Sequence, residues 1–376
     1  MSGWLLVSGD FARNGGMDRA NLELAKFLAT EEPVHLVTHR VDDELSANPN
    51  VTVHRVPRPF GKHLLGQPLL ARAGRTWAAR LAKKGFRVIV NGGNCRWPDA
   101  NWVHCVHAAY PSPAVGGFSM RAKMHATHRL NRWNERRAMR KAQLVVCNSR
   151  RTARDAVELL GVAPERTKVL YLGSDPVEFP AVTESERRMA RSQLGWDERP
   201  WVGFVGQLGN RVKGFDTLYT AWSSLCADPL WDANLVVIGE GPTRAEWEAR
   251  AASDRLAGRI RFLGFRTDVP AVLAGCDALA APSRYDAYGM GVHEALCRGL
   301  PAIVSAAAGV SERYPADLAD MILRDAEDAN ELCDRLKHWR TNLDSFAARI
   351  RPLANELRSR TWADMAREMR DTIFST

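Results

Sequence analysis

The segment Pro282 to Pro301 reads PSRYDAYGMGVHEALCRGLP, and its order predicts a strand, a loop and a helix. The apolar run Ala278–Ala281, directly before it, has the length of a buried strand, and Pro282 and Ser283 interrupt that run. From Met290 to Cys297 the apolar side chains recur at helical spacing. A strand therefore ends in a loop that opens a helix.

The loop and the start of the helix carry residues suited to a phosphorylated sugar. Gly289 and Gly291 leave the backbone N–H groups at the helix start uncovered, and such groups bind an anionic diphosphate without a metal. Asp286 in the loop and Glu294 in the helix are hydrogen-bond acceptors when ionised. The two carboxylates therefore suit the hydroxyl groups of a sugar and a ribose better than they suit the phosphates.

Strands alternate with helical or loop stretches along the whole chain, which predicts two doubly wound, Rossmann-like α/β domains with ligands at the carboxyl ends of parallel strands. The predicted boundary is Gly173–Pro200, which lacks an extended apolar run, and no internal repeat is found. The predicted strands of the first half are Trp4–Ser8, Val34–Thr38, Val51–Val56, Val88–Asn91, Trp102–Val106, Leu144–Cys147 and Val169–Leu172. Those of the second half are Trp201–Val205, Leu235–Ile238, Ile260–Leu263, Ala278–Ala281, Ala302–Ser305 and Met321–Leu323.

An ordered set of motifs resembles the retaining GT-B glycosyltransferases of family 4, the glycosyl transferases group 1. The spacing of Asp286 and Glu294 is similar to the family's E-x7-E signature, and further matches follow in order along nearly the whole chain. They are a Gly-Gly loop near the N-terminus, a central His, VVCNSR, VLYLGSDP, FVGQLGNRVKGFDTL, VVIGEGP and RIRFLGFRTDVP.

The resemblance implies a GT-B fold of two Rossmann-like domains that face a central cleft. The N-terminal, acceptor-side domain would span residues 1–172 and be joined by the C-terminal helix from about 360–376. The C-terminal domain, which binds the donor, would span residues 173–359.

The resemblance also implies roles for the residues of the signature segment. Asp286 would meet hydroxyl groups of the donor sugar, and Glu294 would bind the ribose of the nucleotide. Tyr288, Gly289 and Met290 would offer backbone N–H groups to the diphosphate. The family's usual residue at the first acid is Glu, so Asp286 leaves the identity of the sugar open.

Cations are expected beside this segment, in the loop after the strand Trp201–Val205. They would neutralise the charge that grows on the departing nucleoside diphosphate. Family members commonly carry Arg where Gln207 stands, so Gln207 is assigned to donor binding and Lys213 to the cationic role, with Arg211 as its substitute. Two surface cations in an ordinary βα loop remain the alternative interpretation.

The Gly15-Gly16 loop lies between the first predicted strand and a helix whose apolar positions recur at a spacing of three and four, with Asn14 as its cap. Gly16 N–H could approach a donor phosphate or the acceptor. A turn that only joins strand to helix is the alternative.

His104 and His107 stand at the end of the strand predicted over Trp102–Val106. Side chains three apart in a strand point to opposite faces, and no third ligand follows at a recognised spacing, so no metal site is predicted. By resemblance, His107 is the active-site histidine that contacts the donor sugar or positions the acceptor. His104 is expected to be a packed, hydrogen-bonded core residue.

The predicted reaction is sugar transfer from a nucleotide-diphosphate sugar to an acceptor hydroxyl with retention, in glycan, glycolipid or polysaccharide biosynthesis. No cofactor is expected, and closure of the two domains would assemble the site. Two alternatives stay open: a nucleotide-sugar epimerase on the same scaffold, and a relative that binds nucleotide or membrane without catalysis.

The composition agrees with a two-domain protein of 376 residues. Its seven cysteines are scattered, mostly inside apolar runs, and are expected to be reduced in a cytosolic compartment. No secretory signal and no membrane-spanning run are predicted.

The net charge is +9, from 52 Lys and Arg against 43 Asp and Glu. Between Arg121 and Lys141 eight basic residues accompany the single acid Glu135. Three interpretations of this basic segment stay open: a solvated helix face, contact with the anionic inner surface of a membrane, and contact with an anionic acceptor. Nucleic acid is the weakest candidate partner because no recognition motif accompanies the charge.

The acceptor, glycan or lipid-linked, is expected to meet loops of the first domain at Val56–Gly74 and Tyr110–Met124. The choice between UDP and GDP would depend on backbone contacts near Phe265 and Arg266.

Overall fold

The computed structural model describes all residues except 1–2, 14, 113–116, 210 and 376. The chain divides into two compact units, each with its own sheet. The first unit comprises Met1–Ser112, Ala122–Gly173 and Thr361–Thr376, and the second comprises Pro113–Arg121 and Ser174–Arg360.

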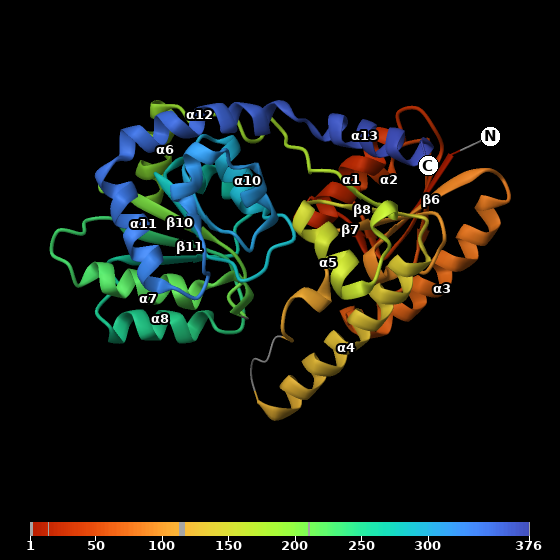
Figure 1. The fold of residues 1–376 in the computed structure, drawn as a ribbon, viewed down its shortest axis with the longest axis horizontal. Helices are drawn as coiled ribbons and strands as arrows, with labels where there is room; N and C mark the ends of the chain where they lie inside the picture. Colours follow the sequence, from red (N-terminus) through yellow and green to blue (C-terminus); the bar gives the residue numbers. More distant parts are fainter. Residues whose placement is uncertain (1–2, 14, 113–116, 210, 376) are drawn as a thin grey trace. The chain divides into compact units, whose positions relative to one another are not determined.

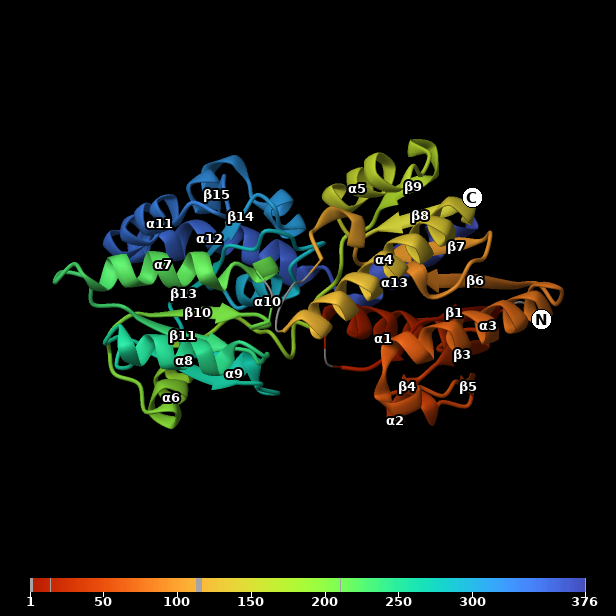
Figure 2. The ribbon, with the colours of Figure 1, turned by 90° about the horizontal axis from the view of Figure 1, so that it is seen from below.

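The first unit is built on a seven-stranded sheet in the order β5-β3-β1-β6-β7-β8-β9, in which every pair is parallel (Figures 1 and 2). Its strands are β1 (Gly3–Val7), β3 (Val34–Thr38), β5 (Val51–Arg55), β6 (Phe86–Asn91), β7 (Ala100–Val103), β8 (Leu144–Cys147) and β9 (Thr167–Val169). All five residues of β1 are buried, as expected for a central parallel strand covered on both faces. A separate two-stranded pair joins β2 (Asp10–Phe11) to β4 (Arg40–Val41).

Six α-helices belong to the described part of this unit. They are α1 (Gly16–Leu28), α2 (Asp43–Ser46), α3 (His63–Ala82), α4 (Phe118–Lys141), α5 (Arg150–Leu160) and α13 (Trp362–Phe374), together with short 3-10 turns that include His107–Ala109. The α3 helix packs on β1, β3 and β6, and α5 packs on β8 and β9. The final helix α13 packs on α1, so the end of the chain covers the helix that follows the first strand.

The second unit is built on a six-stranded parallel sheet in the order β12-β11-β10-β13-β14-β15. Its strands are β10 (Trp201–Val205), β11 (Asn234–Ile238), β12 (Ile260–Gly264), β13 (Ala278–Ala281), β14 (Ala302–Ser305) and β15 (Ile322–Leu323). Its helices are α6 (Glu184–Leu194), α7 (Phe215–Cys226), α8 (Arg244–Ser253), α9 (Val269–Ala274), α10 (Met290–Cys297), α11 (Ala329–Thr341) and α12 (Leu343–Ser359). In Figure 1, α7 and α8 lie below this sheet and α10 and α12 above it.

Each sheet has one point at which the strand order reverses. In the first unit the chain places β3 on one side of β1 and β6 on the other, and in the second unit it places β11 and β13 on the two sides of β10. Ligands of doubly wound folds bind outside the carboxyl ends of the strands at such a point. The loops that follow β1, β6, β10 and β13 are therefore the segments of interest.

The strand predictions were confirmed apart from their ends, and the predicted strand Val169–Leu172 shares only Val169 with β9, which spans Thr167–Val169. Other expectations were wrong. The β7 strand ends at Val103, so His104 and His107 follow it instead of ending it. The expected loops Val56–Gly74 and Tyr110–Met124 contain the starts of α3 and α4. The predicted boundary segment Gly173–Pro200 contains α6, and the division of the chain between Gly173 and Ser174 falls at its start. The α1 helix begins at Gly16 with Gly15 as its N-cap, and the predicted cap Asn14 lies outside the described residues.

Candidate active site

In the second unit, the loops after β10 and β13 are joined by an ion pair. Lys213 Nζ lies 2.6 Å from Asp286 Oδ2, and both side chains are partly exposed. These loops flank the point at which the strand order reverses, because β10 and β13 are neighbours in the sheet. The structure thus brings together the cation and the first acid that the sequence predicted.

A glycine permits the close approach of these two loops. Gly214 has a φ of 71°, and a Cβ atom at this position would lie 1.8 Å from the carbonyl oxygen of Pro282. In the same region Arg284 N–H donates to Val212 O at 2.8 Å. Any other residue at position 214 would push the two loops apart, so Gly214 sets the position of Lys213.

The α10 helix begins at Met290, four residues after Asp286. Gly289 is its N-cap in the left-handed region, with a φ of 106°, and its carbonyl oxygen accepts from the N–H groups of Val292 and His293. Within the described residues no acceptor is found for the N–H groups of Gly289, Met290 and Gly291. This end of the helix therefore presents donors and the positive end of the helix dipole.

The other members of the signature have distinct surroundings. The Tyr288 side chain is buried, its hydroxyl lies 3.0 Å from His293 Nδ1, and its carbonyl oxygen accepts from Val310 N–H. Tyr288 therefore contributes a packed side chain as well as a backbone hydrogen bond. Glu294 lies in the second turn of α10 and is half-buried.

Arg211 is held by carboxylates in a surface network. Its Nε lies 2.7 Å from Asp216 Oδ2 and its Nη2 lies 3.0 Å from Glu327 Oε2. The same two acids pair with Arg284, whose pKa is raised by its bonds to Glu327 and Asp216. Burial opposes the ionised form of Asp216, but bonds from Arg284 and Arg211 outweigh it and lower the pKa of Asp216. The network accounts for Arg211 without a ligand.

Gln207 is exposed in the loop after β10. The backbone on either side of it lies in close contact with the loop after β11. A Cβ atom at Gly239 would lie 1.9 Å from Gly206 O, and one at Gly241 would lie 1.9 Å from Leu208 O. The glycines of the GEGP motif therefore allow the loops after β10 and β11 to pack backbone to backbone.

In the first unit, the Gly15-Gly16 loop leads into α1 beside a group of charges. Gly15 has a φ of 95° and its carbonyl oxygen accepts from Arg19 N–H. Asp18, in the first turn of α1, has its pKa raised to about 6 by burial and then by the charge of Asp10. Asp10 itself accepts hydrogen bonds from Arg40 and Arg58, each at 2.8 Å.

His107 is oriented by a carboxylate that the sequence analysis did not select. Glu135 on α4 is 1% exposed, and its Oε2 accepts from His107 N–H at 2.9 Å and lies 2.8 Å from His107 Nδ1. Its Oε1 accepts from Ala108 N–H at 3.1 Å. An ionised carboxylate only accepts, so Nδ1 carries the proton and Nε2 is the nitrogen that Asn131 Nδ2 approaches at 3.3 Å. The sequence signal was present, since Glu135 is the single acid among eight basic residues.

His104 and His107 line one pocket, which corrects the expectation that they point to opposite faces. The alternation of a strand does not apply to them because β7 has ended and a 3-10 turn follows. His104 is buried as expected, but neither of its ring nitrogens has a hydrogen-bond partner among the described residues.

No group of three or more histidine, cysteine or acidic side chains that could hold a metal ion is found in the described part of the chain. The seven cysteines are all free, and five of them are buried. Among the described helices, none combines the length and the apolar character that crossing a bilayer requires.

Two family models match the chain. Residues 14–178 match the model described as Glycosyltransferase Family 4, and residues 199–342 match the model described as Glycosyl transferases group 1. The first contains the Gly15-Gly16 loop and His107, and the second contains Lys213, Asp286 and Glu294.

Individual proteins agree with these models. The chain is 32% identical over 213 residues to a 2-deoxystreptamine glucosyltransferase of Streptomyces kanamyceticus, a match that covers 56% of this chain and 53% of that protein. It thus spans about half the length of that relative. It is 27% identical over 340 residues to a D-inositol 3-phosphate glycosyltransferase of Salinispora tropica, which covers 82% of this chain and 70% of that protein.

A solved structure has the same fold. The structure of Anabaena HepE in complex with UDP and glucose superposes with a TM-score of 0.74 at 21% identity and covers 99% of both chains. Together with the two family models, the two parallel Rossmann-like sheets identify the chain as a member of the GT-B glycosyltransferases of family 4, a retaining family.

Proposed function

We propose that the protein transfers a hexose from a nucleoside-diphosphate sugar to an acceptor hydroxyl with retention of configuration. The observation that carries this proposal is the Lys213–Asp286 pair at the carboxyl ends of β10 and β13, directly before the uncovered N-terminus of α10. A fixed cation, a free set of backbone donors and an acid at a strand reversal suit a sugar diphosphate.

Each group of the second unit takes a role that its chemistry allows. The N–H groups of Gly289 and Met290 would bind the diphosphate, with Tyr288 beside them, while Lys213 neutralises its charge. Asp286 would accept from sugar hydroxyls, and Glu294 would accept from the ribose.

The remaining predicted residues take supporting roles. Gln207 would contact the donor without supplying charge, and Gly15 and Gly16 would bring backbone close to it. His107, held by Glu135, would present Nε2 to the donor sugar or to the acceptor. Arg211 is assigned to the surface network and not to the diphosphate, because both of its bonds go to carboxylates.

The chemical step proposed is a front-face substitution. Retaining glycosidases use a carboxylate nucleophile beside the anomeric carbon, but the Asp286 carboxylate is held in an ion pair with Lys213. The leaving phosphate oxygen would instead accept the proton of the attacking hydroxyl. Stabilisation of that oxygen by Lys213 and the α10 N-terminus then supplies most of the catalysis.

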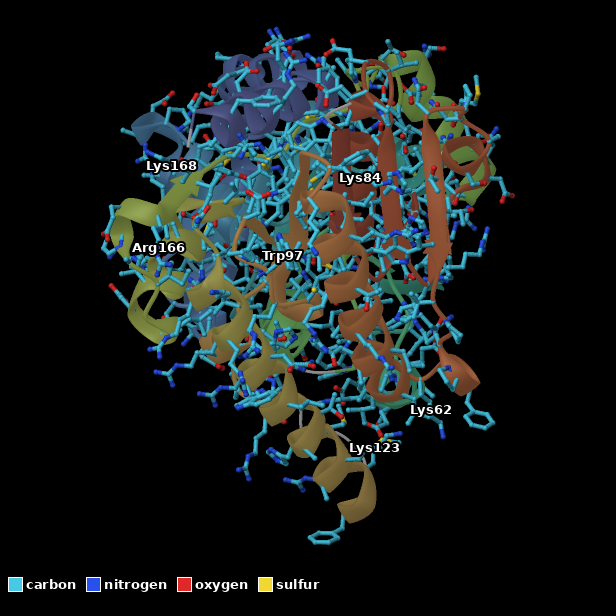
Figure 3. The ribbon with its side chains drawn as sticks, turned by 90° about the vertical axis from the view of Figure 1, so that its right-hand side faces the viewer. Lys62, Lys84, Trp97, Lys123, Arg166 and Lys168 are labelled. Carbon is cyan, nitrogen blue, oxygen red and sulfur yellow. The ribbon has the colours of Figure 1, made fainter. Side chains whose placement is uncertain are left out.

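The protein is proposed to work in the cytoplasm, in contact with the anionic inner surface of the membrane. Supporting this, α4 carries its basic side chains on the exposed face, and Phe118 and Trp133 are 90% and 55% exposed. Figure 3 shows basic side chains projecting outward from α4 around Lys123. Basic and aromatic residues on one helix are typical of a helix that binds at a lipid surface, and co-sedimentation with anionic vesicles tests this contact.

A thermal-shift panel with UDP, GDP, ADP and their sugars tests the donor assignment, with UDP-glucose as the first candidate because Anabaena HepE binds UDP and glucose. The nucleotide that binds should raise the unfolding temperature of the protein. Incubation with the sugar nucleotide alone separates the alternatives: an epimerase would change the sugar without an acceptor, whereas a transferase would hydrolyse it slowly at most.

Lys213→Ala then tests the site itself. Loss of the only cation assigned to the diphosphate should lower kcat by about 10²–10³-fold, as for other donors to a developing anion. Arg211→Ala should lower kcat less than tenfold, and Lys337→Ala on α11 should leave it unchanged. Equal losses for Lys213→Ala and Arg211→Ala, or none for either, would contradict the assignment.

A further inference from the structure

A pocket of about 180 Å³ lies in the first unit at the reversal of its strand order. Its wall is formed by Asn91 at the end of β6, by the Gly92–Asn94 turn that follows, and by residues of α1, α3, α4 and the segment after β7. Drug-sized ligands occupy pockets of about 300–1,000 Å³. This pocket therefore has room for one ring of a ligand and not for a whole oligosaccharide.

The polar lining of the pocket is almost entirely uncharged. Five carboxamides line it: Gln67, Asn91, Asn94, Asn131 and Asn134. Among the described residues that line the pocket there is no lysine or arginine, and the only carboxylate is Glu135.

The Glu135 carboxylate is already satisfied. It accepts from two backbone N–H groups and from His107 Nδ1, and it is 1% exposed. A phosphate or carboxylate in the pocket would meet no permanent cation, and an ammonium group would meet a carboxylate that is already engaged. Charged ligands are recognised by charged partners, so the lining selects against both signs.

His104 adds a specific requirement. It is 8% exposed, its ring lies 4.2 Å from that of Trp102, and neither Nδ1 nor Nε2 has a protein partner among the described residues. Burial lowers the pKa of His104 to about 3, so the ring is neutral at physiological pH. A neutral imidazole has one donor and one acceptor, and both are costly to leave unpaired in a buried site.

We propose that this pocket binds an uncharged, polyhydroxylated ring of the acceptor, a sugar or a cyclitol, and that His104 selects it by exchanging hydrogen bonds with a ring hydroxyl. A hydroxyl group both donates and accepts, which matches the two unpaired nitrogens and the carboxamides around them. The inference deepens the proposed function, on which it rests, by naming the chemical class of the acceptor.

Saturation-transfer NMR on the full chain, in the presence of UDP, tests the class of ligand. The probes are myo-inositol, methyl α-D-glucopyranoside and methyl α-D-mannopyranoside as neutral rings, with glucose 6-phosphate and glucosamine as charged counterparts. Octyl β-D-glucopyranoside below its micelle concentration distinguishes a ring carried on a lipid from a free sugar. At least one neutral ring should bind, and it should bind more tightly than the charged counterparts.

His104→Phe tests the residue, because phenylalanine keeps the packing on Trp102 but cannot bond a hydroxyl. The variant should lower the affinity for the neutral ring by about 3- to 10-fold, which corresponds to the loss of one or two neutral hydrogen bonds. His104→Gln, which keeps one donor and one acceptor, should restore most of the affinity. His54→Phe is the matched control, since His54 stacks on Trp77 in the same unit and does not line the pocket.

The inference is overturned if no neutral ring binds, if glucose 6-phosphate or glucosamine binds more tightly, or if His104→Phe binds the ring as the parent does. UDP affinity is measured on every variant. If the parent protein binds none of UDP, GDP and ADP, the result counts against the proposed function. If it binds one of these nucleotides but no neutral ring, the result counts against this inference alone.

Discussion

At the scale of single residues, His107 depends on a partner 28 positions away in the sequence. Glu135 accepts hydrogen bonds from His107 Nδ1 and from the backbone N–H groups of His107 and Ala108. One carboxylate therefore fixes both the ring and the turn that carries it. The close approach of α4 is possible because Gly93 has no side chain: a Cβ atom there would lie 3.1 Å from the backbone nitrogen of Glu135. Glu135 is therefore a positioning residue for His107.

Glu135→Gln is expected to lower kcat by about tenfold or more while nucleotide affinity stays unchanged. The carboxamide keeps the shape of the side chain, but its NH₂ group faces an N–H that needs an acceptor, which costs about 1–3 kcal/mol of stability. The proton of the His107 ring is then no longer held on Nδ1. In other enzymes, replacing the acid that orients a catalytic histidine lowers kcat for this reason. Steady-state kinetics and the pH profile of kcat measure the effect.

Glu158→Gln is the matched control for that variant, because Glu158 is an exposed acid on α5 of the same unit. It should change neither kcat nor the pH profile. An unaltered pH profile in Glu135→Gln, with loss of stability alone, would mean that Glu135 is structural only.

Asp18 carries a pH dependence of stability with a definite sign. Burial and the charge of Asp10 raise its pKa from 3.8 to about 6 in the folded protein. Between these pH values the folded state binds more protons than the unfolded state, so this group makes stability fall as pH rises through that window. Asp18→Asn should therefore stabilise the protein by about 1–2 kcal/mol at pH 7, after allowance for partial solvent exposure, and by almost nothing near pH 4.

Denaturant unfolding of parent and Asp18→Asn at pH 4, 5, 6 and 7 measures the difference. Asp43→Asn provides the control, since Asp43 is an exposed acid in the first turn of α2. It should be neutral or slightly destabilising at every pH, because it loses a favourable interaction with the helix dipole. If the free energies of unfolding of the parent and of Asp18→Asn differed by the same amount at every pH, the pKa of Asp18 would not be raised in the folded protein.

At the scale of elements, the apolar runs were sufficient to find the strands. Five predicted strands match to the residue, among them Leu144–Cys147, Trp201–Val205 and Ala278–Ala281, because a strand buried on both faces of a parallel sheet is a continuous apolar run. The two-residue strands β2 and β4 were missed since they are too short to show a pattern. The end of β7 was misplaced because apolar residues continue past Val103 into a 3-10 turn.

The candidate site was predictable only where its members share a motif. The signature segment and Lys213 were readable because each lies within a single strand-loop-helix unit, the first between β13 and α10 and the second between β10 and α7. Glu135 stood out in the sequence only as the single acid among eight basic residues. Its contact with His107 and the missing partners of His104 could not be read, since these surroundings come from helices and turns distant in sequence. The pairing of Arg211 with Glu327, 116 positions away, was also not readable from the sequence.

The basic face of α4 gives a prediction at this scale. Replacing Arg129, Arg132 and Arg136, all exposed, by Gln should weaken binding to vesicles that contain phosphatidylglycerol by about 100-fold, because each basic residue near an anionic surface contributes about 1 kcal/mol. Co-sedimentation at low and at physiological salt measures it. Arg137, which lies over the Trp133 ring at 4.3 Å, is left intact so that the aromatic contact is unchanged.

The control is an equal loss of charge elsewhere on the same unit, with Arg72, Arg75 and Lys83 at α3 replaced by Gln. It should reduce vesicle binding only slightly. If both triple variants lose the same affinity, the attraction comes from net charge, and if neither does, α4 is a solvated helix face.

At the scale of the whole molecule, the last helix belongs to the first unit although it follows the second along the chain. The break lies between α12 and α13, where Thr361 and Asp364 form a capping box that starts a new helix. Trp4 on β1 meets Phe374 edge-on with ring centroids 5.5 Å apart. The first unit is therefore completed only when the end of the chain has been made.

Met369→Ala should separate the stabilities of the two units. Met369 is fully buried on α13, so the loss of its side chain should cost the first unit about 2–5 kcal/mol. Calorimetry of the full chain should show a lowered transition for that unit, while the transition of the second unit keeps its temperature and still rises on addition of UDP. UDP at 100 times its Kd should add about 2.7 kcal/mol to the free energy of unfolding of the unit that binds it.

Met189→Ala, which replaces an exposed methionine on α6, is the control and should move neither transition. If Met369→Ala lowers both transitions together or abolishes the UDP shift, the two units unfold as one and the nucleotide depends on both.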